Sequence, residues 1–229
     1  DGYISMTYDL DTGTEPYPDR INPPLFAWAE WEHYLATGDD SRFARVTPKI
    51  EKHMDWIHAN RRTAPHRRRR SAEGAHGGMG EASDAYQLYW FEDCGSSGMD
   101  NSPRAPRKPE AGRFFDWVDL SSQMALSFDC LSRMRRAMGD AARADLWAAR
   151  ARETAGLIND ELWCERTRFY HDRTLPMNFV SCKTVAGFWP ILAGVCSPDR
   201  LDALLEHLMD EREFNRPTPV PSLSADDPN

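Results

Sequence analysis

The sequence lacks the cysteine and histidine patterns that hold small proteins together or bind metal ions. Its 5 cysteines are odd in number, lie far apart and include no C-x-x-C pair, which excludes the usual zinc and dithiol redox motifs. The 7 histidines include no H-E-x-x-H pattern, so no metal site is predicted. Free thiols are typical of a reducing compartment, and we therefore expect a cytoplasmic location.

Long apolar runs and an excess of positive charge are also missing. No stretch approaches the roughly 20 apolar residues that a membrane-spanning helix needs, and the first residues show no signal-peptide pattern. Because the chain does not begin with Met, this second observation concerns only the residues present. The formal net charge of -8 argues against nucleic acid and anionic membranes as partners. The sequence does not indicate an oligomeric state.

The sequence is rich in aromatic residues and in amphipathic helical patterns. It contains 8 Trp, 10 Phe and 7 Tyr, a globular composition. No sheet is predicted, although residues 165–174 could form a hairpin. Prolines at positions 48 and 190 are expected to kink or divide the helices that contain them. The expected helices, which form three successive hairpins, cover residues 23–37, 43–57, 119–138, 140–163, 183–193 and 198–208.

The segment YWFEDCGSSGMDNSPR, residues 89–104, carries the most chemistry. Glycosidic bond cleavage usually needs one protonated carboxyl and one ionised carboxylate, and Asp100 suits the first role. Gly98 permits a close backbone approach, Asn101 can orient sugar hydroxyls, and Trp90 offers a flat apolar surface. The alternative is a plain turn, because Gly, Asp, Asn, Ser and Pro are the usual turn residues. The residue types alone leave both interpretations open.

Part of this segment, SSGMDNSPR (residues 96–104), resembles the acid-bearing segment of glycoside hydrolase family 63. The resemblance implies an all-α fold, the (α/α)6 toroid, with residues 1–229 forming about half of one catalytic domain. Residues 61–116 are rich in Arg, Gly, Pro and Ser and lack sustained helical periodicity, so we expect them to form a long active-site loop. Four further segments follow in the family's order: NPPLFAWAEW (22–31), VDLSSQMAL (118–126), KTVAGFWPILAG (183–194) and PSLSADDPN (221–229).

The resemblance also implies a function and a set of site residues. Members of this family and the related trehalases hydrolyse α-glucosidic or α-mannosidic bonds with inversion and without a cofactor, so the expected protein is an exo-acting α-glycosidase with a carbohydrate substrate. Asp100 is then the general acid. Asn22 stands where family members often have Gln, and Lys183 begins a family-like segment. The candidate substrate-binding residues are Trp90, Asn101, Arg104, Asn22 and Lys183.

Two features of the sequence complicate this assignment. An arginine beside Asp100 would depress the pKa of an acid that needs it raised, so we expect Arg104 to pair with Glu92 or Asp93 instead. The family's general base is a Glu downstream of Asn229, so residues 1–229 alone are expected to be inactive. A non-catalytic toroid that binds sugars or serves as a scaffold is the alternative from another functional class.

Overall fold

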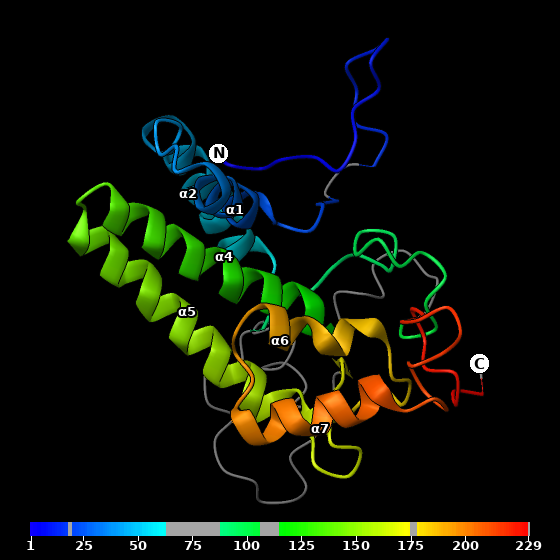
Figure 1. The fold of residues 1–229 in the computed structure, drawn as a ribbon. Helices are drawn as coiled ribbons and strands as arrows, with labels where there is room; N and C mark the ends of the chain where they lie inside the picture. Colours follow the sequence, from blue (N-terminus) through cyan, green and yellow to red (C-terminus); the bar gives the residue numbers. More distant parts are fainter. Residues whose placement is uncertain (18–19, 63–87, 106–114, 175–177, 229) are drawn as a thin grey trace, which may run out of the picture.

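The computed structural model describes residues 1–17, 20–62, 88–105, 115–174 and 178–228. Over these ranges the protein is mainly helical (Figure 1), as expected for an all-α fold. Most of the predicted loop at 61–116, including the basic run at 66–71, lies outside the described residues. The helices are α1 (Phe26–Thr37), α2 (Phe43–Asn60), α4 (Val118–Ala137), α5 (Ala141–Glu161), α6 (Trp189–Leu192) and α7 (Pro198–Met209), with a 3-10 helix, η2 (Val185–Phe188), before α6.

Two short antiparallel pairs of strands accompany the helices, where the sequence suggested only a hairpin. A hairpin is present, but it begins two residues before the predicted region: β2 (Trp163–Cys164) pairs with β3 (Phe169–Tyr170). The second pair joins β1 (Phe115–Asp116) to β4 (Arg173–Thr174). Both sheets are only two strands wide, so they fix loops against the helices and build no layer of their own.

Several helix ends follow the local rules that the sequence suggested. Helix α1 ends at Gly38, and Gly139 follows the end of α4; both glycines have the left-handed backbone conformation, with φ of 71° and 79°, that terminates helices. Asp140 caps α5, where its carboxylate accepts a hydrogen bond from the backbone N–H of Arg143 at 3.2 Å. These ends depend on interactions within a few residues.

The two proline-containing segments behave differently: α2 is not divided at its proline, whereas residues 183–193 are divided beside theirs, as expected. Helix α2 continues through Pro48, because a proline in its second turn removes a single hydrogen bond from 18 residues of helix. Its N-cap, Arg42, makes no side-chain hydrogen bond to the helix end. Residues 183–193 form no continuous helix. Pro190 instead lies in the first turn of α6, where its missing N–H is not needed.

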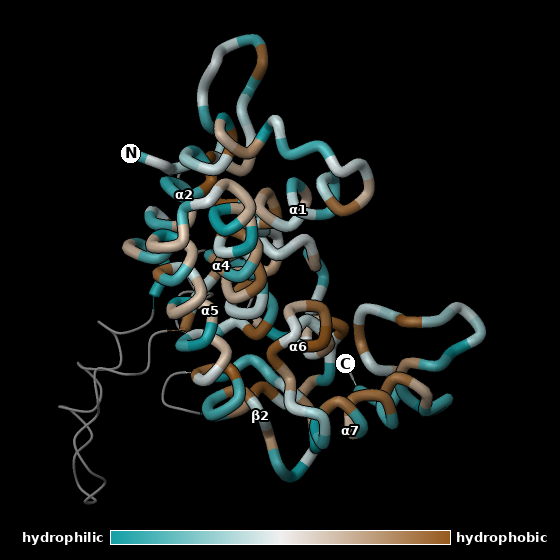
Figure 2. The backbone as a smooth tube through the Cα atoms, turned by 60° about the vertical axis from the view of Figure 1, so that its left-hand side comes forward, coloured by the Kyte–Doolittle hydropathy of each residue, from teal (hydrophilic) through white to brown (hydrophobic). Residues whose placement is uncertain are grey.

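Helix α4 is the centre of the molecule. In Figures 1 and 2 it runs between the pair α1 and α2 on one side and the region of α6 on the other, with α5 antiparallel beside it. It supplies Leu120, Met124 and Phe128 to one hydrophobic core, and Val118 and Ala125 to the second core around β3 and α7. Since 15 of its 20 residues are buried, its polar groups need partners inside the protein.

Serines allow α4 to be buried on several sides. The Ser122 hydroxyl donates to the Val118 carbonyl at 2.7 Å, and the Ser127 hydroxyl donates to the Pro24 carbonyl at 2.6 Å. The Ser121 hydroxyl accepts from the backbone N–H of Tyr89 at 3.2 Å. The last of these bonds fixes the start of the segment that carries Asp100 against the N-terminal half of α4.

A glycine in the segment 183–194 is required by close packing. A Cβ atom added at Gly187 would lie 2.2 Å from Cε1 of Phe169 and 2.6 Å from the carbonyl oxygen of Tyr170. Gly156, inside α5, would meet nothing within 4 Å. The two glycines therefore form a matched pair for substitution: a side chain at Gly187 would clash with its neighbours, and one at Gly156 would not.

We predict that Gly187→Ala lowers the free energy of unfolding by about 1–3 kcal/mol through overpacking. Gly156→Ala is expected to raise it by up to about 1 kcal/mol, because Ala is the better helix former. Thermal and urea unfolding of the two variants tests both directions. Equal stabilities would contradict the packing seen around Gly187.

Glu51 joins three helices through one buried carboxylate. From α2 it accepts hydrogen bonds from Arg135 of α4 at 2.7 Å, and from Arg143 and Trp147 of α5 at 2.9 and 2.8 Å. Burial acts to raise the pKa of Glu51, but the hydrogen bonds from Arg135 and Trp147 and the charges of both arginines lower it further, so the pKa lies below its usual value. The folded state therefore favours the ionised form.

We predict that Glu51→Gln lowers the free energy of unfolding near pH 7 by about 2–4 kcal/mol, since two arginines lose their charged partner. A depressed carboxyl pKa stabilises the fold above the unfolded pKa, and this stabilisation is lost as the pH falls through the folded pKa. The difference between wild type and variant should therefore shrink below pH 4.5, the ordinary value for Glu.

The control for this prediction is Glu206→Gln, which removes an exposed pair with Arg168 and should change stability by less than about 0.5 kcal/mol. Urea unfolding from pH 7 to pH 3 measures both differences. A stability gap for Glu51→Gln that did not vary with pH would show that the carboxylate charge is not what stabilises the fold.

Candidate active site

Asp100 lies in a turn whose two ends are tied together. The carbonyl of Cys94 accepts hydrogen bonds from the backbone N–H groups of Ser97 and Met99 at 3.1 and 3.2 Å, and the N–H of Ser102 donates to the Met99 carbonyl at 2.9 Å. Gly98 has φ +79°, which its lack of a side chain permits. These hydrogen bonds fix the backbone around Asp100. Asp100 itself and the following Asn101 are exposed to solvent.

Three charged side chains, including that of Asp100, lie around Gly95. The position that a Cβ of Gly95 would occupy is 3.2 Å from Oδ1 of Asp93, 3.7 Å from Nη1 of Arg20 and 4.0 Å from Oδ1 of Asp100. Arg20 and Asp93 form an ion pair at 2.5 Å. Asn22 is exposed two residues after Arg20, so the segment that contains it lies beside the turn of Asp100.

Arg20 is a site residue that the sequence did not reveal. It belongs to no motif, and 73 residues separate it from Asp93. The prediction that Arg104 pairs with Glu92 or Asp93 was wrong, because Arg20 pairs with Asp93 and the guanidinium of Arg61 lies 4.0 Å from Glu92. Arg20, the arginine beside the turn of Asp100, therefore has its charge balanced by Asp93.

Trp90, predicted as a sugar platform, is packed inside the protein. Only 8% of it is exposed. The guanidinium of Arg61 lies 4.5 Å from the centre of its ring and 5.0 Å from that of Trp56, an arrangement typical of cation–π contacts. Its ring therefore supports the segment before the acid and presents little surface to a ligand.

Arg104 is also inside the protein. Its guanidinium donates to Oδ2 of Asp119 at 2.6 Å and to Oδ2 of Asp172 at 3.3 Å, and it lies 4.3 Å from the ring centre of Trp117. The exposed fractions of the three charged side chains are 1%, 1% and 4%. The sequence marked Arg104 for a sugar contact, whereas the structure places it between two carboxylates.

The pKa values in this cluster follow from burial and mutual charge. Burial raises the pKa of the Asp172 carboxyl to about 6, with a further contribution from the charge of Asp119, while Arg104 opposes both. Burial acts to lower the pKa of the Arg104 guanidinium. The charges of Asp119 and Asp172 have the larger, opposite effect and raise this pKa above its ordinary value. Arg104 is therefore charged, and Asp172 is partly protonated in mildly acidic solution.

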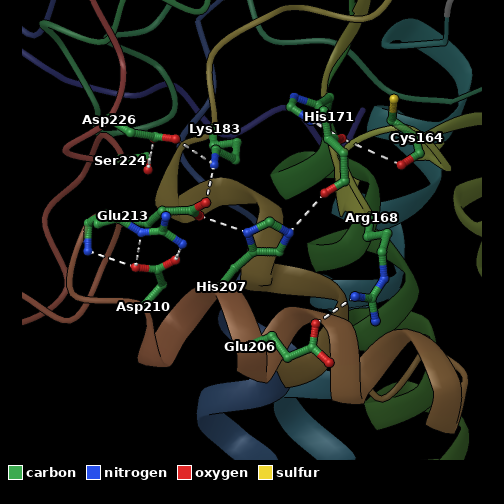
Figure 3. A network of polar contacts seen from close by, with 12 residues as sticks. Cys164, Arg168, His171, Lys183, Glu206, His207, Asp210, Glu213, Ser224 and Asp226 are labelled. Carbon is green, nitrogen blue, oxygen red and sulfur yellow. Dashed lines mark hydrogen bonds and ion pairs between the residues drawn. The ribbon is translucent and has the colours of Figure 1, made fainter.

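Lys183 forms part of a different network, near the C-terminal end of the described chain (Figure 3). Its Nζ donates to Glu213 and, at 3.0 Å, to Asp226. Glu213 also contacts Nδ1 of His207 at 2.7 Å, and Nε2 of His207 lies 2.9 Å from the carbonyl oxygen of Thr167. The structure therefore assigns Lys183 to the attachment of residues 213–226.

Neither metal ligands nor a membrane span is found in the part of the chain that the structure describes. No group of three or more His, Cys, Asp or Glu residues there could hold a metal ion. None of the helices described there has the length and apolar character to cross a membrane.

The helices packed around α4 define a helical domain, and the family match identifies its class as a glycoside hydrolase domain. Residues 81–229 match the Mannosylglycerate hydrolase MGH1-like glycoside hydrolase domain, and the chain belongs to this family. The resemblance to glycoside hydrolase family 63 that the sequence suggested is confirmed. The fold is likewise that of the (α/α)6 toroid enzymes of that family.

Individual relatives agree with this classification. An uncharacterized protein of Borreliella burgdorferi is 26% identical over 220 residues, which cover 96% of this chain and 40% of that protein. The GH63 mannosylglycerate hydrolase from Thermus thermophilus in complex with glucose has a TM-score of 0.70 at 18% identity, covering 100% of this chain and 64% of that one. A GH78 family rhamnosidase of a Bacillus species has a TM-score of 0.60 at 17% identity, covering 89% of this chain and 19% of that one. The chain thus spans less than two thirds of the length of these proteins.

We predict that Lys183→Met lowers the free energy of unfolding by about 1–3 kcal/mol, because Glu213 and Asp226 lose their shared cation. The matched control is Arg136→Met, which breaks an exposed pair with Asp145 and should have a smaller effect. Thermal unfolding compares the two. An unchanged melting temperature for Lys183→Met would show that the network does not stabilise the fold and would favour a ligand contact.

Proposed function

We propose that residues 1–229 belong to one (α/α)6 catalytic domain of an inverting, exo-acting α-glycosidase that hydrolyses α-glucosidic or α-mannosidic bonds. Asp100 is its general acid. One observation carries this proposal. In a chain of a glycoside hydrolase family, an exposed carboxyl sits on a hydrogen-bonded turn within the segment that resembles the acid-bearing segment of family 63.

In the proposed reaction, Asp100 donates a proton to the oxygen of the leaving group while a second carboxylate activates a water on the opposite face of the sugar ring. An inverting site needs these two groups roughly 6.5–9.5 Å apart. Asp93 is committed to an ion pair with Arg20, which leaves it poorly suited to take a proton from water. The resemblance to family 63 puts the base downstream of Asn229.

The exposed polar residues beside the acid are the proposed sugar contacts. Asn101 follows Asp100 directly, and Asn22 lies on the segment that Arg20 attaches to the turn. Amide side chains both donate and accept hydrogen bonds, which suits sugar hydroxyls. Trp90, Arg104 and Lys183 are engaged inside the protein, and the proposal gives them no sugar contact.

The choice of substrates to test follows from the relatives. The matching family is described by mannosylglycerate hydrolysis, and the Thermus enzyme was solved with Tris and D-glycerate. We therefore propose α-mannosides and α-glucosides of small hydroxy acids as the first substrates.

We predict that Asp100→Asn in the intact protein lowers kcat on substrates with poor leaving groups by roughly 10²- to 10⁴-fold, because Asn cannot supply the proton. An activated aryl glycoside, whose leaving group needs no proton, should be affected far less. Steady-state kinetics on both substrate types tests this, with Asp145→Asn on the exposed face of α5 as the control.

Near-normal turnover of the poor leaving groups by Asp100→Asn would remove Asp100 from the role of acid. An intact wild-type protein that binds these sugars without hydrolysing any of them would instead support the sugar-binding alternative. Detection of the first-formed anomer by NMR distinguishes inversion from retention.

A further inference from the structure

Arg104 connects the acid-bearing turn to two segments that are distant in sequence. It follows Asp100 by four residues, and its carboxylate partners are 15 and 68 residues further along the chain. Asp119 lies in the first turn of α4, and Asp172 follows β3. With 1% of its side chain exposed, Arg104 has no surface left to offer a ligand.

The partners of Arg104 are themselves fixed to regular elements. Oδ1 of Asp172 accepts a hydrogen bond from the backbone N–H of Val118, the first residue of α4, at 2.8 Å. Trp117, fully buried, packs against the guanidinium. Arginine binds carboxylates with a planar set of donors in defined directions, so this cluster determines where the backbone of residue 104 lies relative to α4.

The other end of the turn is fixed as well, through Asp93 and Arg20. Between these two anchors, the Ser102 N–H bonds to the Met99 carbonyl at 2.9 Å, and the Arg104 N–H bonds to the Ser102 hydroxyl at 3.5 Å. A shift of Arg104 is therefore transmitted to the residues on both sides of Asp100. Misplacement of a catalytic group by about 1 Å can cost roughly 10²-fold in rate.

We propose that Arg104 is a positioning residue for the general acid: Asp119 and Asp172 clamp its guanidinium so that the turn holds Asp100 in the direction of the scissile bond. The proposal rests on the proposed role of Asp100. Buried ion clusters can often be replaced by apolar residues without loss of stability. Stability alone therefore does not require these three charged residues, whereas a positioning role does.

The test uses Arg104→Lys and Arg104→Met in the intact protein, with the poor-leaving-group substrate and the activated aryl glycoside measured side by side. We expect kcat on the poor leaving group to fall about 10- to 100-fold in both variants, with the smaller loss in Arg104→Lys, which keeps one charged contact. KM on both substrates and turnover of the activated substrate should change by less than about threefold. Arg135→Lys, in the buried network of Glu51, is the matched control and should show no such selectivity.

A second measurement does not depend on turnover. Hydrogen exchange of the Met99 and Ser102 amides, both bonded within the turn, should accelerate at least about tenfold in Arg104→Met, while amides in the middle of α5 keep their wild-type rates. A purely structural role would instead accelerate exchange throughout and lower turnover of both substrates together, which would overturn the proposal.

Two further outcomes separate the hypotheses. A rise in KM on both substrates at unchanged kcat would show that Arg104 binds sugar and would also overturn the positioning role. If Asp100→Asn fails to discriminate between the leaving groups, the proposed function itself fails. If Asp100→Asn discriminates and the Arg104 variants do not, only the positioning role is lost.

Discussion

The burial of α4 is the constraint on which the rest of this structure depends. A helix with neighbours on several sides cannot leave its polar groups in water, so every charge and hydroxyl on its buried faces needs a partner within the protein. Serines bonded to nearby carbonyls meet this need along its length. At its two ends the same need is met by buried ion clusters, which hold Asp119 at the start and Arg135 near the end.

In each cluster, the charged residues at the end of α4 have the sign that the helix dipole favours. The carboxylates of Asp119 and Asp172 lie at the N-terminus of α4, where the partial charge of the helix is positive, and Arg135 lies in its last turn, where it is negative. Each cluster also connects α4 to another segment: Arg104 joins it to the acid-bearing turn, and Glu51 joins it to α2. The charged residues that allow α4 to be buried therefore also fix the segments that pack against it.

The features that could be predicted from the sequence are those decided within a few residues. The ends of α1 and α4 and the cap of α5 follow from Gly38, Gly139 and Asp140, and the family followed from a nine-residue segment. The partners of Arg104 and the approach of Arg20 to Asp93 join residues far apart in the chain, and no local pattern encodes them. The close packing of Gly187 on Phe169 likewise joins residues far apart in the chain.

The substrate-binding candidates show why residue type alone misleads at such a site. Trp and Arg are suited to carbohydrate, yet the same flat ring and planar cation are also suited to the interior, where Trp90 packs on Arg61 and Arg104 on Trp117. An acid must be reachable by its substrate and yet held in one direction. For the proposed general acid, these requirements fall on different residues of the segment 96–104: Asp100 stays exposed, and the arginine four positions later is buried.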